Sequence, residues 1–67
     1  MKQQQIQQIM KAHINFEIVT SDYHSPRLNE NKVEFLKEGL IKIEHSELTT
    51  IYIEAKNIKY IIGVGKV

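Results

Sequence analysis

The chain has 67 residues, no cysteine and a formal net charge of +1. A chain of this length is expected to form one small domain, residues 1–67, of marginal stability, and it has neither disulfides nor a Cys-type zinc site to support it. Its weak net charge provides no strong field to steer it towards phosphate backbones. The lack of cysteine fits a reducing cytoplasm, and no apolar run reaches the roughly 20 residues that span a bilayer. We therefore expect a cytoplasmic protein without a membrane partner, for which oligomerisation is the remaining support.

The N-terminal segment is predicted to be helical over residues 2–13. Ile6, Ile9 and Met10 recur at helical spacing, and His13 continues the same stripe. Five glutamines, which are good helix formers, occupy the other faces. A disordered, glutamine-rich interaction tail is the less favoured alternative, because the glutamines surround an apolar stripe.

Residues 14–19 are predicted to form a strand, because Ile14, Phe16 and Ile18 alternate with less apolar neighbours. From residue 20 to residue 31 this alternation is lost, turn-forming residues dominate, and Pro26 is incompatible with a central strand. A loop of about a dozen residues is long for so small a domain, and such loops are often functional or mobile.

Strands 32–36 and 40–45 are predicted to pair as a hairpin. A three-residue loop, 37–39, would place Gly39 where a positive φ is needed. One face of the hairpin is then entirely apolar and contains Val33, Phe35, Ile41 and Ile43. The other face carries two opposite-charge pairs, Glu34 with Lys42 and Lys32 with Glu44. Because a shift of one residue would mix the two faces, this register is strongly favoured.

Strands 50–55 and 58–64 are predicted to form a second hairpin around residues 56–57. In its register Glu54 opposes Lys59, and Tyr52 opposes Ile61. Its core-facing residues would be Ile51, Ile53, Ile58, Tyr60 and Ile62. A short connection at 45–49 would join the two hairpins into a meander.

These elements predict an α+β domain in which a short N-terminal helix packs on a mostly antiparallel sheet of four to five meandering strands. A helix followed by five strands is also the element order of small SH3-like and Sm-like barrels. That likeness is one of layout, without signature residues, and it leaves a closed barrel as the alternative architecture.

No arrangement of residues predicts catalysis, a metal site or a cofactor. The three histidines lie in different predicted elements without convergent ligand spacing. The chain has no Gly-x-Ser-x-Gly elbow, and the segment 63–65 lacks the features of a phosphate loop. We therefore expect a protein that is not an enzyme and that holds neither metal nor cofactor.

The predicted registers send four apolar residues to the face away from the core: Leu36, Leu40, Tyr52 and Ile61. Adjacent exposed apolar residues are typical of an interaction surface. Two explanations are equally favoured: loop 20–31 and strand 14–19 fold over this face, or another chain covers it. We expect a non-catalytic module that docks on another protein or on a second copy of itself. A small regulator or inhibitor of the phage or mobile-element type would fit this size.

The alternative function is binding of single-stranded nucleic acid. Tyr52 could stack on a base while Lys42 and Lys59 hold the backbone, as aromatic and basic residues do on other sheets. Glutamates predicted for the same face oppose this reading, because they cancel the positive field.

Overall fold

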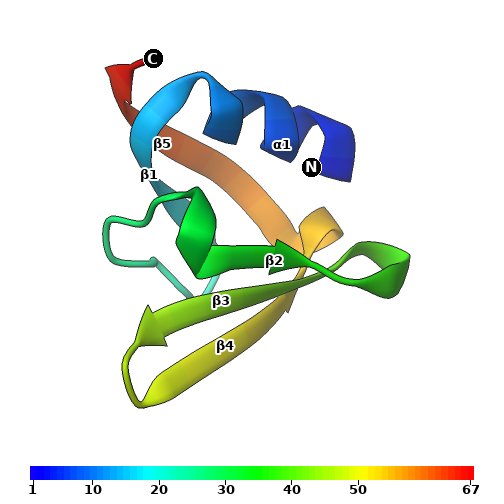
Figure 1. Ribbon diagram of the computed structural model, residues 1–67. Coiled ribbons are helices and arrows are strands. Elements are labelled where there is room, and N and C mark those ends of the chain that lie inside the picture. Colours follow the sequence, from blue (N-terminus) through cyan, green and yellow to red (C-terminus); the bar gives the residue numbers. More distant parts are fainter.

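The computed structural model describes all 67 residues and contains one α-helix and five strands (Figure 1). The elements are α1 (Gln3–Lys11), β1 (His13–Thr20), β2 (Val33–Phe35), β3 (Leu40–Ser46), β4 (Thr49–Glu54) and β5 (Ile58–Lys66). Short 3₁₀ turns precede three of the strands, at Glu30–Lys32, Lys37–Gly39 and Ala55–Asn57. The predicted α+β class is confirmed.

The strands form two antiparallel sheets. β1 pairs with β5, and β2, β3 and β4 form the second sheet in that order. No ladder joins the two sheets into one continuous barrel, so the barrel alternative is not confirmed. In Figure 1, α1 lies above β2 and along the β1–β5 pair, against which it packs.

One hydrophobic core draws on the helix, on both sheets and on the loop that follows β1. Its nine buried residues are Ile6, Met10, Phe16, Ile18, Leu28, Ile41, Ile43, Ala55 and Ile58. Burying an aliphatic or aromatic side chain of this size is worth roughly 1.5–3 kcal/mol. A domain of this length has a small total stability, so each of these contacts matters.

Helix α1 supplies Ile6 and Met10 to this core, as its apolar spacing predicts. The helix ends earlier than predicted: its last amide is that of Ala12, which donates to the carbonyls of Gln8 and Ile9, and the chain then turns into β1. His13 is therefore the first residue of β1, and its ring Nδ1 lies 2.8 Å from the Ile9 carbonyl oxygen.

The first predicted hairpin is confirmed in its register, but Lys32, which is predicted to oppose Glu44, lies in the preceding 3₁₀ turn and not in the ladder. Val33 opposes Ile43 and Glu34 opposes Lys42 in the β2–β3 ladder. Gly39 has a φ of +77°, as predicted, and Glu38 before it also has a positive φ of 61°. The opposite charges of Glu34 and Lys42 lie in register but form no ion pair; Lys56–Glu54 is the one contact within 4.0 Å between a lysine and a carboxylate.

The second predicted hairpin is wrong. β4 pairs only with β3, and the 3₁₀ turn at Ala55–Asn57 carries the chain to the other sheet, where β5 pairs with β1. The 3₁₀ turn buries Ala55 and redirects the chain, and β5 finds in β1 a partner that places Ile61 opposite the buried Ile18. The predicted Glu54–Lys59 and Tyr52–Ile61 pairs are consequently not formed.

This exchange of partners inverts the faces predicted for most of β5. Ile61 opposes Ile18 and packs against the core. Tyr60 and Ile62, which were predicted to be core residues, instead point outwards and are 52% and 38% exposed.

The segment 20–31 is not a free loop. It folds back along the second edge of β1, where Phe16 and Leu28 exchange two backbone hydrogen bonds of 2.9 and 2.8 Å. The Ser25 amide donates to the Ile18 carbonyl, and the Ser25 hydroxyl accepts from the Ile18 amide at 2.8 Å. The segment therefore covers one edge of the β1–β5 sheet and supplies the core residue Leu28.

The turn between β2 and β3 provides a test of the register. Gly39→Ala is expected to lower the free energy of unfolding by about 1 kcal/mol, because φ at this position is positive. The added Cβ would meet no heavy atom within 4 Å, so the cost is conformational rather than steric. Glu38→Gly relieves the same kind of strain and should not lower stability. Urea unfolding of both variants checks the prediction, and an unchanged midpoint for Gly39→Ala would contradict it.

Candidate functional site

The structure brings together only some of the residues predicted for the interaction surface. Leu36 and Leu40 meet across the β2–β3 turn, where the Leu36 amide donates to the Leu40 carbonyl at 2.8 Å, and both side chains are half-buried. Tyr52 is exposed on β4, with 56% of its surface accessible. Ile61 lies in the other sheet against the core, so it does not belong to the same surface.

Tyr52 lies in a row of outward-facing residues that crosses the three-stranded sheet. Lys42 on β3 is directly opposite Tyr52, and Glu34 on β2 is directly opposite Lys42. Leu40 opposes Glu54 in a neighbouring row of the same face. The surface around Tyr52 is therefore amphipathic, with one aromatic anchor among charges of both signs.

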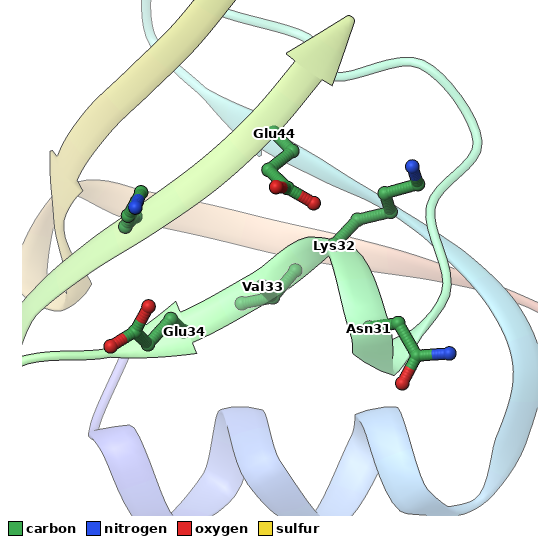
Figure 2. Close-up of a pocket in the computed structure, with 6 residues that line it drawn as sticks. Asn31, Lys32, Val33, Glu34 and Glu44 are labelled. Carbon is green, nitrogen blue, oxygen red and sulfur yellow. The ribbon is translucent and has the colours of Figure 1, made fainter. Parts of the chain in front are cut away.

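A shallow hollow of about 240 Å³ lies beside this row (Figure 2). Its lining is almost entirely polar and consists of Asn31, Lys32, Val33, Glu34, Lys42 and Glu44. Figure 2 shows the side chains of Lys32, Glu34 and Glu44 around it. Because two lysines face two glutamates, the hollow has no clear preference for a cation or an anion. No group of three or more His, Cys, Asp or Glu side chains in the protein could hold a metal ion.

A more apolar groove of about 470 Å³ separates α1 from β2. Met10, Val33 and Phe35 form its apolar part, and Lys11 and Glu30 lie at its polar margin. The groove leads into the core, and its apolar lining consists of core residues and of residues packed against them.

The segment 20–31 is held to the three-stranded sheet by an aromatic contact. The Tyr23 hydroxyl lies 2.9 Å from Nδ1 of His45 on β3, and the two ring centroids are 5.7 Å apart. Burial raises the pKa of Tyr23 above its ordinary value of 10.0, because the charged phenolate is poorly solvated there. Nearby, Nε2 of His24 lies 2.7 Å from Oε1 of Glu17 and ties the segment to β1 as well.

The feature that sequence reasoning missed is an open strand edge beside Tyr52. Ten backbone hydrogen bonds lie outside the regular ladders and helices, and none of them involves a residue of β4. β4 bonds to β3 on one side only, so its other side presents unpaired N–H and C=O groups. The sequence could not reveal this edge, because the predicted hairpin paired it with β5.

Comparison of the chain with protein families, with curated proteins and with solved structures found no match. The nine-residue helix α1 is too short to cross a membrane.

The half-buried Tyr23 predicts a dependence of stability on alkaline pH. The unfolded chain loses the phenolic proton at lower pH than the folded protein, so the stabilisation is fully present below about pH 10 and is lost as the pH rises through the folded pKa. We expect the free energy of unfolding to decrease above about pH 10 and Tyr23→Phe to reduce that decrease. Urea titrations over a series of pH values check this; identical pH profiles for the two proteins would contradict it.

Proposed function

We propose that this protein is a non-catalytic binding module that docks on another protein through the outer face and open edge of β4. One observation carries the proposal: Tyr52 is 56% exposed on a strand whose outer side has no hydrogen-bonding partner. Exposed aromatic residues are the commonest anchors of protein interfaces, and an open edge can accept a partner's strand through main-chain hydrogen bonds.

The neighbours of Tyr52 suit an interface of this kind. Leu40 is its diagonal neighbour across the β3–β4 ladder and adds half-buried apolar surface, which Leu36 extends at the β2–β3 turn. Lys42 and Glu54 would form the charged rim that surrounds the anchors of stable interfaces. Ile61 is omitted from this site, because it faces the core from the other sheet.

The mixed charges around Tyr52, with Lys42 directly opposite it and Glu34 opposite Lys42, suit the rim of an interface and favour a role in docking. A cytoplasmic regulator or inhibitor of the phage or mobile-element type remains the kind of protein that this size and cysteine-free composition fit.

Single-stranded nucleic-acid binding is a second candidate, favoured by one observation. Lys42 lies directly opposite Tyr52, which places a cation beside an exposed aromatic ring. Two observations weaken it: Lys59 lies in the other sheet, and Glu34 and Glu54 flank the pair on the same face. Oligonucleotide binding that weakens steeply with salt would support this second function over the first.

The docking proposal is tested by capture of partners from the native host. The tagged protein, its Tyr52→Lys variant and a Tyr60→Lys control are compared by mass spectrometry of the bound proteins. Tyr60 is a matched control, because it is 52% exposed but lies on β5 in the other sheet. We expect Tyr52→Lys to lose the specific partner at least about tenfold and Tyr60→Lys to retain it. Equal capture by all three proteins would contradict the site.

A further inference from the structure

Three strand edges of the protein are free of a pairing partner: the outer edges of β2, β4 and β5. Natural proteins protect such edges by keeping the strand short, by placing lysine side chains on it, or by glycines and bulges that disturb its regular backbone. β2 has only three residues and follows directly on Lys32. β5 contains Lys59, at which the β1–β5 register shifts, and two glycines, Gly63 and Gly65, the second with a φ of +71°.

β4 has none of these protections. Its first five residues, Thr49–Ile53, are uncharged and are all β-branched or aromatic, which is the composition most prone to pair with another strand. The irregularity in this sheet lies in β3, between Glu44 and Ser46, so β4 itself runs regularly. Figure 1 shows β4 at the lower margin of the fold with no element beyond it.

The residues of β4 are self-complementary in an antiparallel arrangement centred on Tyr52. In that register Tyr52 faces Tyr52 of a second copy, and Ile51 faces Ile53, so that inward residues meet inward residues. Thr50 faces Glu54, whose carboxylate can accept a hydrogen bond from the threonine hydroxyl. Ile51 and Ile53 are only half-buried in the single chain, and a second strand would cover them further.

We infer that the partner seated on β4 is a second copy of this chain, paired antiparallel about a two-fold axis at Tyr52 to give a continuous six-stranded sheet. This inference rests on the proposed docking function and names its partner. A two-fold arrangement closes on itself, so it yields a dimer rather than an open filament.

The two-fold register makes a charge-exchange experiment decisive. Tyr52→Lys places two lysines opposite each other in the dimer, and Tyr52→Glu places two glutamates there; each variant alone should raise the dimer dissociation constant at least about tenfold. An equimolar mixture of the two variants should restore a dimer, because unlike charges then meet.

Thr50→Lys should tighten the dimer, since the new lysine faces Glu54 of the second copy. Tyr60→Lys, on the other sheet, should leave it unchanged.

Mass measurement by light scattering over a concentration series gives the readout, with circular dichroism to check folding.

A second measurement, disulfide cross-linking, does not depend on charge. The chain has no cysteine, so Tyr52→Cys introduces a single thiol. Directly opposite residues of antiparallel strands have Cα atoms about 4.5–5.5 Å apart, within the range of a disulfide. Mild oxidation should cross-link Tyr52→Cys into a dimer and leave Tyr60→Cys largely monomeric.

A wild-type protein that stays monomeric throughout, or a dimer indifferent to charge at position 52, would overturn the inference. Failure of the mixed variants to associate would overturn the two-fold register. These outcomes are distinguishable from failure of the docking function: a monomer that still captures a different protein in a Tyr52-dependent manner keeps the proposed function and loses only the identity of the partner.

Discussion

Two small sheets share a single apolar core here, and the stripe of α1 completes the enclosure of that core. Ile6 and Met10 lie in the same buried cluster as Phe16 of β1 and Ile41 of β3, so they connect the two sheets. A chain of 67 residues buries only a modest share of its surface and has no disulfide to compensate. We therefore expect the packing of the two sheets against each other to depend strongly on this helix–sheet contact.

The same constraint determines which strand edges are free. β1 is bonded on one edge by β5 and on the other by the segment around Ser25 and Leu28, so neither edge is left open as that of β4 is. The 3₁₀ turn between β4 and β5 directs β5 away from β4 and towards β1, where Ile61 packs against the core. An exposed edge beside Tyr52 is thus a consequence of how the core is filled.

Local sequence patterns were sufficient to predict the helix and the first hairpin. The 37–39 loop fixed its register, because only one alignment places Val33 and Phe35 opposite apolar residues. The same reasoning gave the wrong second hairpin, because the true partner of β5 is β1. The paired residues of β1 and β5 lie from 38 (Thr20 and Ile58) to 53 (His13 and Lys66) residues apart in the sequence and leave no local signal. Leu28 was missed because a lone apolar residue in a polar segment has no periodicity.

The candidate site was predictable only in part for the same reason. The exposure of Tyr52 and its proximity to Lys42 depend on the faces of β3 and β4, which alternation indicates correctly. The open edge and the exposed Tyr60 depend on which strands pair over long distances. No pattern confined to one strand carries that information.

The stability of Ile6→Ala, measured by urea unfolding beside the exposed Gln4→Ala control, tests most directly whether α1 holds the two sheets together. Ile6 is fully buried, and truncation of such a side chain typically costs about 2–5 kcal/mol. We expect a loss in this range for Ile6→Ala, enough to unfold much of so small a domain, and almost none for the exposed Gln4→Ala. Equal unfolding midpoints for the two variants would contradict it.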